Sequence, residues 1–266
     1  MTRELGAALE PPVSLPYLSH SRLHRYLHCP EQYRLYYVER LRPRIPDAAL
    51  VFGQLMHQAL SALFRTGEDP VAHFQSAWLE VKSADLSYGK RESWEGLAFT
   101  GRALLATFVR DELPKLQHVT ASEKPFSIIV TSLGVPLVGV VDLVAELEGN
   151  QTVVDFKTSA SAYPDFEAPL SDQLSAYQLA EPETEQAALC VLVKTKDPRI
   201  DWHVTKRAPV QIGEYLDKAE FVAGAIVRGE FYKRPGRWCG YCDFLPVCLG
   251  DQERAQGTLV QVAAHD

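Results

Sequence analysis

Two aspartates and a lysine stand at the ends of apolar segments that have the composition of β-strands. Asp142 follows Gly139-Val-Val, and Asp155 follows two valines and precedes Lys157 by two residues. Two carboxylates on adjacent antiparallel strands can hold a hard cation such as Mg²⁺ or Mn²⁺. Such an ion neutralises charge on a phosphodiester and lowers the pKa of a bound water molecule. The side chain of Lys157 projects from the same face of the strand as that of Asp155. Its ammonium group can therefore hold the attacking water and stabilise developing negative charge.

An alternative interpretation assigns these residues no chemistry. Asp155 and Lys157 could form an exposed pair on a strand, and Asp142 could simply end one. However, each aspartate directly follows valines, and charged residues inside apolar strands are seldom buried without a partner. The pattern therefore favours a metal site.

Four further residues could belong to the same site. His57 lies on an expected amphipathic helix, where its imidazole could bind the metal, although a lone helix histidine is more often structural. Glu123 could supply another carboxylate or could equally lie on the surface. Gln173 and Tyr177 are four residues apart and hence on one helix face. They could contact a nucleotide, steady Lys157 or face solvent.

Helices and strands must bring these residues together. Hydrophobic spacing predicts helices at 50–65, 70–83, 94–117, 171–180 and 210–229, after two short helices that begin at Ser19 and Pro30. Strands are expected at 126–130, 135–147, 152–156, 187–194 and 200–204, with a tight turn at Gly149-Asn150. The order is helices, three strands, a helix and more strand, with no internal repeat and no long linker.

The bulk composition is that of a globular protein. The chain has 266 residues, 46% of them hydrophobic and 23% charged, which is enough for one large core. No apolar run approaches the roughly 20 residues of a membrane-spanning helix. The first residues lack the basic-then-apolar pattern of a signal peptide. We therefore expect a cytoplasmic protein with no membrane partner.

The net charge of −7 does not exclude a nucleic-acid ligand, because binding requires only a local basic track. Six arginines lie between residues 22 and 44 against two glutamates, and a second basic cluster occupies 228–237. Either run could be an ordinary solvated helix face, but both flank cysteines, which favours a phosphate-binding surface. The residues expected to contact nucleic acid are Arg22, Arg25, Tyr26, Arg34 and Tyr36.

Four of the five cysteines could share one site. Cys239, Cys242 and Cys248 form a C-x2-C-x5-C motif near the C-terminus, and Cys29 lies near the N-terminus. In a cytoplasmic protein, cysteines indicate metal or redox chemistry rather than disulfides. Four thiolates suffice for a [4Fe–4S] cluster or a Cys₄ zinc site, and unrelated buried cysteines are the remaining alternative. Cys190 sits in an apolar strand and is expected in the core.

Taken in order, these motifs resemble those of the RecB-family nucleases of the PD-(D/E)XK superfamily. The likeness is closest to the AddB-type nuclease domain and the iron–sulfur nucleases of CRISPR adaptation. Each motif is weak alone, but the ordered set is highly specific and spans residues 19–248, nearly the whole chain. The matching segments are Ser19–Tyr33, Gly53–His57, Gly139–Asp142, Asp155–Lys157, Gln173–Tyr177 and the three C-terminal cysteines.

The resemblance implies an α/β, restriction-endonuclease-like fold: a mixed central sheet flanked by helices, with N-terminal helices and an iron–sulfur cluster that joins the chain ends. It implies metal binding by His57, Asp142 and Asp155, aided by the backbone carbonyl of Phe156. It also assigns the four cysteines to a [4Fe–4S] cluster rather than to zinc. The residues expected in catalysis are Lys157, Asp142, Asp155, Gln173 and Tyr177.

These features together predict a Mg²⁺- or Mn²⁺-dependent deoxyribonuclease, an exonuclease acting on single-stranded or frayed DNA ends in repair or recombination. Val141 occupies the proline position of the PD motif, which varies widely in this superfamily, so activity is still expected. One alternative is a catalytically silent DNA-binding or scaffold subunit of a helicase–nuclease complex. Another is a regulatory module whose fold is stabilised by a zinc ion.

The chain contains no G-x-x-x-x-G-K-[ST] loop of an ATP-driven motor. Strand separation would therefore come from fraying or from a partner such as a helicase or another repair protein. The expected organisation is a flexible arm at 1–16, one nuclease domain with its cluster module at 17–249, and a C-terminal tail at 250–266.

Overall fold

The computed structural model describes residues 13–263 of the chain. Most of the expected arm, residues 1–12, and residues 264–266 of the expected tail lie outside the described part. The chain divides into two compact units. Within the described residues, unit 1 comprises residues 13–44, 128–138 and 216–263, and unit 2 comprises residues 45–127 and 139–215.

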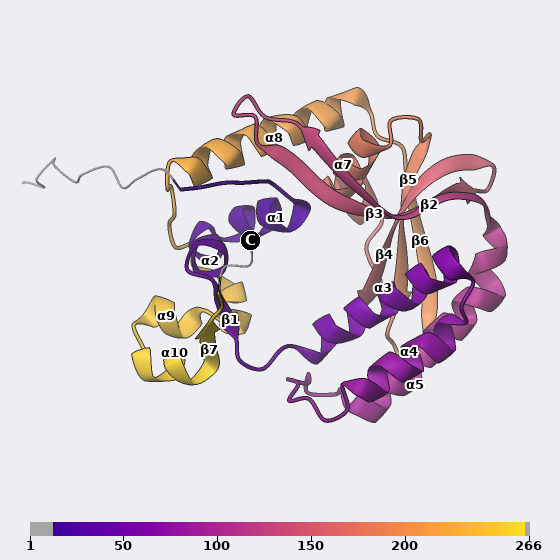
Figure 1. Cartoon of the computed structure of the whole chain (residues 1–266), viewed down its shortest axis with the longest axis horizontal. Helices are drawn as coiled ribbons and strands as arrows, with labels where there is room; N and C mark the ends of the chain where they lie inside the picture. Colours follow the sequence, from indigo (N-terminus) through magenta and orange to yellow (C-terminus); the bar gives the residue numbers. More distant parts are fainter. Residues whose placement is uncertain (1–12, 264–266) are drawn as a thin grey trace, which may run out of the picture. The chain divides into compact units, whose positions relative to one another are not determined.

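A mixed five-stranded sheet is the centre of the fold, with the strand order β2-β3-β4-β5-β6 (Figure 1). Strands β3 and β4 are antiparallel, β4 and β5 are parallel, and β5 and β6 are antiparallel. A parallel pair needs a crossover connection, which the helices between β4 and β5 supply. This sheet confirms the predicted α/β class with a mixed central sheet. The strands are β2 (Leu116–Ile129), β3 (Pro136–Leu147), β4 (Asn150–Ser159), β5 (Gln186–Val193) and β6 (Arg199–Thr205).

Helices of unit 2 cover both faces of this sheet. Alternate strand residues point to opposite faces. Val154 and Cys190 therefore join a core with α3, α4 and α5, whereas Val153 and Leu189 pack against α6 and α7. The helices are α3 (Ala48–Thr66), α4 (Pro70–Glu80), α5 (Trp94–Thr107), α6 (Glu167–Leu170) and α7 (Asp172–Ala180). Cys190 is fully buried as predicted, and burial raises the pKa of its thiol well above the ordinary value.

The predicted turn between β3 and β4 is present, but it lies one residue earlier than the expected Gly149-Asn150. Leu147 pairs with Asn150, which leaves Glu148 and Gly149 as a two-residue loop. Both loop residues have positive φ, 51° and 82°. Two consecutive positive φ values define a type I′ turn, whose twist matches that of the flanking strands.

Unit 1 is mainly helical. Ser19 caps α1 by accepting a hydrogen bond from the Arg22 amide, and Pro30 opens α2, both as predicted. The segment expected as a tail contains α10 and β7, and β7 pairs antiparallel with β1. The elements are α1 (His20–His28), α2 (Pro30–Tyr33), a π-helical turn (Arg34–Val38), β1 (Leu41–Pro43), most of α8 (Pro209–Val227), a 3₁₀ turn (Arg237–Tyr241), α9 (Leu245–Leu249), α10 (Gln252–Thr258) and β7 (Leu259–Gln261).

The segment before Phe126 differs from the sequence expectation. The helix predicted over 94–117 ends as π and 3₁₀ turns by Lys115, and β2 begins at Leu116, ten residues before the predicted strand. The first half of β2 is polar and largely exposed at the edge of the sheet, so it lacks the apolar alternation that identifies strands. Glu123 therefore lies within β2 and not before the first strand. Among the described residues, no helix combines the length and apolarity needed to cross a bilayer.

Candidate active site

Strands β3 and β4 separate next to the two aspartates. Their pairing stops at Leu143 and Val154, whereas β4 remains paired with β5 as far as Ser159. Just beyond the last pair, Asp142 Oδ2 accepts a hydrogen bond of 2.9 Å from the amide of Phe156. A side-chain carboxylate thus satisfies a backbone donor that the neighbouring strand leaves unpaired. The β3–β4 pairing therefore ends beside the carboxylates.

Lys157 and Asp155 form an ion pair on β4, just past the end of its pairing with β3. Lys157 Nζ lies 2.9 Å from Oδ1 and 2.8 Å from Oδ2 of Asp155, whose residue exposure is 0%. Gln173 accepts from Lys157 Nζ at 2.7 Å and donates to Asp155 Oδ1 at 3.1 Å and to the Tyr177 hydroxyl at 3.0 Å. The Tyr177 hydroxyl donates to Asp142 Oδ1 at 3.1 Å. Helix α7 therefore orients all three charged side chains, which favours the interpretation that Gln173 steadies Lys157.

The environment sets the charge of these groups. Burial raises the pKa of Asp155, although the charge of Lys157 opposes this shift. Burial alone would lower the pKa of Lys157, but the Asp155 carboxylate outweighs it and the net shift is upward. Burial also raises the pKa of Tyr177 well above its ordinary value. At neutral pH, Lys157 is therefore a cation and Tyr177 is a neutral hydrogen-bond donor.

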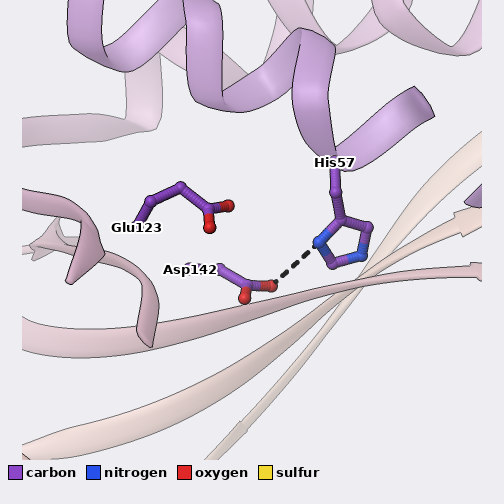
Figure 2. Close-up of side chains that lie close together, drawn as sticks. All are labelled: His57, Glu123 and Asp142. Carbon is purple, nitrogen blue, oxygen red and sulfur yellow. Dashed lines mark ion pairs between the residues drawn. The ribbon is translucent and has the colours of Figure 1, made fainter. Parts of the chain in front are cut away.

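His57, Glu123 and Asp142 converge from three different elements, α3, β2 and β3 (Figure 2). One potential ligand atom from each lies within 4.8 Å of the other two. His57 Nδ1 is 3.3 Å from Asp142 Oδ2, the contact that is dashed in Figure 2. Glu123 has φ +51°, a left-handed conformation that is uncommon for a residue with a side chain. We interpret this local irregularity of β2 as the feature that directs the Glu123 carboxylate into the site.

This donor set fits a divalent cation. Two carboxylates and an imidazole offer the oxygen and nitrogen ligands that such ions take in proteins. Of the expected ligands, His57 and Asp142 belong to the set and Glu123 completes it, whereas the Asp155 carboxylate is turned to Lys157 and Gln173. Asp155 is thus a neighbour of this trio, and its own role as a metal ligand stays a prediction. The Phe156 amide donates a hydrogen bond to Asp142. The metal-ligand role of the Phe156 carbonyl stays a prediction.

The site opens into a groove of about 1100 Å³ in unit 2. One wall is α3, and Lys157 and Thr158 of β4 contribute to the lining. A side chain at Gly53 would place its Cβ 3.1 Å from Thr158 Oγ1, closer than almost all real contacts. The glycine therefore permits the close approach of α3 to β4 that brings His57 to the carboxylates.

The cysteine motif and Cys29 line one cavity in unit 1. Cys29, Cys239, Cys242 and Cys248 all contribute to its wall, and its volume is about 250 Å³. Two hydrogen bonds end on the sulfurs: Gln32 Nε2 lies 3.5 Å from Cys242 Sγ, and the Gly236 amide 3.4 Å from Cys239 Sγ. The structure therefore gathers the four residues that the sequence analysis grouped.

Two of the residues expected to contact nucleic acid are instead bonded to other residues of unit 1. Tyr26 is only 4% exposed, and its hydroxyl donates to the Glu230 carbonyl at 2.7 Å. Arg34 is paired with Glu31 at 2.8 Å and with Glu39 at 2.7 Å. A buried ring cannot stack on a base, and a doubly paired guanidinium has little attraction left for a phosphate. These contacts correct the expectation for Tyr26 and Arg34.

The remaining residues of that set form cation–π contacts. The Arg25 guanidinium lies 3.8 Å from the Tyr36 ring centroid, and Arg42 lies 3.4 Å from the same ring. Arg22 lies 4.4 Å from the Tyr37 ring. Stacking of this kind stabilises the packing of α1 on the π-helical turn, and a nucleic-acid role for Arg22, Arg25 and Tyr36 stays a prediction.

Comparison with known proteins agrees with this geometry. Residues 17–249 match the family model of the PD-(D/E)XK nuclease superfamily. A candidate exonuclease from Eubacterium rectale has a similar solved structure, with a TM-score of 0.54 and 16% identity over 85% of this chain and 87% of its own, which shows a shared fold. The solved structure of SSO0001 is 15% identical over 90% of this chain and 88% of its own, with a TM-score of 0.46. A search of curated proteins finds no significant match. Because the family model covers most of the chain and the whole candidate site, this protein belongs to the PD-(D/E)XK nuclease superfamily.

Proposed function

We propose that this protein is a Mg²⁺- or Mn²⁺-dependent deoxyribonuclease that hydrolyses phosphodiester bonds, acting as an exonuclease on single-stranded or frayed DNA ends. One observation carries the proposal: Lys157, Asp155, Gln173, Tyr177 and Asp142 form one continuous hydrogen-bonded network beside the His57–Glu123–Asp142 trio. A lysine fixed next to a carboxylate donor set is suited to stabilise charge on a reacting phosphate.

Each member of the network has a distinct role in this proposal. A divalent cation bound by His57 and Asp142, with Asp155 or Glu123, supplies charge neutralisation and an activated water. Lys157 presents its ammonium group to the scissile phosphate and the attacking oxygen. Asp155 and Gln173 hold that ammonium group in place.

Tyr177 keeps the carboxylate of Asp142 oriented by donating one hydrogen bond, while the Phe156 amide donates the other. These two donors leave Asp142 little rotational freedom, which is the preorganisation that electrostatic catalysis requires. The role of α7 is therefore positioning, without direct contact with the reacting atoms.

The depth of the site supports the preference for single strands. Asp155 is fully buried and the Asp142 side chain is 10% exposed, so the reacting phosphate must reach deep into the groove. A flexible single strand reaches such a recess with less distortion than a base-paired duplex, for which extruding a nucleotide costs about a few kcal/mol.

The proposal is tested by initial rates on matched single-stranded and blunt duplex oligonucleotides in Mn²⁺. End-labelled single strands should be degraded at least about tenfold faster, because each 1.4 kcal/mol of distortion corresponds to a tenfold change in rate. No cleavage of either substrate would contradict the nuclease assignment. Equal or faster cleavage of the blunt duplex would contradict the substrate preference alone.

For the second site we propose a [4Fe–4S] cluster held by Cys29, Cys239, Cys242 and Cys248. All four residues line the same cavity of about 250 Å³, so their side chains surround one space. The N–H donors to Cys242 and Cys239 support this assignment, because hydrogen bonds to the sulfurs stabilise reduced clusters.

Iron analysis of anaerobically purified protein should give about four iron atoms per chain. Cys248→Ala should lose most of the iron and lower the Tm by about 10 °C, because the link between distant segments then no longer restricts the unfolded chain. Cys190→Ala is the matched control and should retain its iron, since Cys190 lies in the core of unit 2. Stoichiometric zinc in place of iron would contradict the cluster.

A further inference from the structure

Helix α3 continues for more than two turns beyond His57 along the groove. Residues 57, 61 and 65 are spaced by four and therefore share one face of the helix. His57, Ser61 and Arg65 all line the groove that contains Asp142 and Lys157. At 1.5 Å per residue, the distance along the helix from His57 to Arg65 is about 12 Å.

Arg65 is the cation of this groove that has no protein partner. Its side chain is exposed, and within residues 13–263 no hydrogen bond or ion pair involves its guanidinium. By contrast, Lys157 is held by Asp155 and Gln173. The lining between His57 and Arg65 is neutral, since Gln58, Ser61 and Ala62 carry no charge. An anion lying along this wall would therefore meet its next positive charge at Arg65.

The groove becomes acidic directly after Arg65. Gly67 ends α3 with φ +73°, and Glu68 follows on the groove wall. Glu68 accepts a hydrogen bond from Thr66 and lies 3.0 Å from His73 Nδ1, which keeps its carboxylate ordered. That hydrogen bond from His73 also lowers the pKa of Glu68, so a negative charge stands there at neutral pH. The charge along this wall therefore changes from positive at Arg65 to negative at Glu68.

We propose that Arg65 binds a backbone phosphate of the DNA strand a few nucleotides from the scissile phosphate and so defines one end of a short strand-binding track along α3. This inference rests on the nuclease function proposed above. The 12 Å length corresponds to at most about three to four nucleotides, because 3.4 Å is the axial spacing of a strand in duplex DNA and an extended single strand spaces its phosphates more widely. Arg65 is a positioning residue in this assignment, because it contacts substrate away from the reacting atoms.

Binding of a labelled single-stranded oligonucleotide of about 12 nucleotides, measured by fluorescence anisotropy in EDTA, tests the track without cleavage. Arg65→Gln should weaken binding about tenfold, the effect of losing one charge-assisted hydrogen bond of about 1.5 kcal/mol. The slope of log Kd against log salt should fall by about 0.7, the value for one phosphate contact to a single strand. Arg65→Lys should restore most of the affinity, since lysine also binds phosphate as a point charge.

Arg102→Gln is the matched control, because Arg102 is exposed on α5 and does not line the groove. It should leave Kd and the salt slope unchanged, and the Tm of both glutamine variants should equal that of the wild type. In cleavage assays, Arg65→Gln should raise KM for the long oligonucleotide and leave kcat within about twofold, whereas a dinucleotide, too short to reach Arg65, should be unaffected.

The outcomes separate this inference from the proposed function. Equal Kd values for Arg65→Gln and Arg102→Gln would overturn the track even if the wild type cleaves DNA. Arg65-dependent binding by a protein that never cleaves DNA would overturn the nuclease function and leave the binding site standing. An absence of DNA binding by the wild type would overturn both.

Discussion

Lys157→Ala is expected to lower kcat for DNA cleavage by about 10²–10³-fold, because removing one preorganised electrostatic donor commonly raises the barrier by about 2.7–4 kcal/mol. The structure adds a second consequence. Lys157 is the ion-pair partner of the fully buried Asp155, and loss of one member of a buried pair destabilises a protein by about 3–5 kcal/mol. Cleavage and stability must therefore be measured together.

Lys157→Gln separates the two effects. Glutamine can still donate a hydrogen bond to Asp155 but carries no charge, so it should recover most of the lost Tm and little of the lost kcat. Lys206→Ala is the control, since Lys206 is exposed and lies outside the groove. Rates within a few fold of the wild type for a folded Lys157 variant would refute the assignment of the active site.

Asp142→Asn should lose both cation affinity and cleavage. Asp142 is the residue shared by the metal-ligand trio and the hydrogen-bonded network, through His57 on one side and Tyr177 on the other. Asparagine has the same shape but no charge, so the site should lose the cation, which when bound supplies about several kcal/mol of transition-state stabilisation. We expect the rate at saturating DNA and fixed Mn²⁺ to fall by at least about 10²-fold.

Calorimetric titration with Mn²⁺ provides the independent measurement. The wild type should bind the ion and Asp142→Asn should not, while Asp85→Asn, an exposed change outside the groove, should behave as the wild type. Glu123→Gln should also weaken binding, because Glu123 belongs to the ligand trio. An Asp142 variant that binds Mn²⁺ with wild-type affinity would exclude the His57–Glu123–Asp142 trio as the metal site.

The order and type of the central elements were predictable from local patterns. Asp142 and Asp155 lie on neighbouring antiparallel strands, and Asp155 and Lys157 share a strand face, because side-chain alternation is a local property of the backbone. The turn after β3, predicted to within one residue, and the helix starts at Ser19 and Pro30 depend on a few consecutive residues and were equally predictable.

The polar edge strand was not predictable in the same way. The first half of β2 is largely exposed and has no hydrophobic pattern that would identify a strand. The first residues of β2 were therefore assigned to the preceding helix. Glu123 was uncertain for this reason. Its position in the ligand trio depends on the pairing of β2 with the sheet and on a left-handed backbone conformation that the glutamate side chain does not itself favour.

By itself, the sequence determined which chemistry this protein could perform: a lysine beside carboxylates, a helix histidine and four cysteines in two distant groups. Only the tertiary structure decided which of these groups meet. It turned the Asp155 carboxylate to Lys157, brought Glu123 to His57 and buried Tyr26, and it left Arg65 unpaired within the described part of the chain. The physical reason is that charge and ligand type are properties of single residues. Partners and exposure, by contrast, depend on contacts between segments that are far apart in the chain.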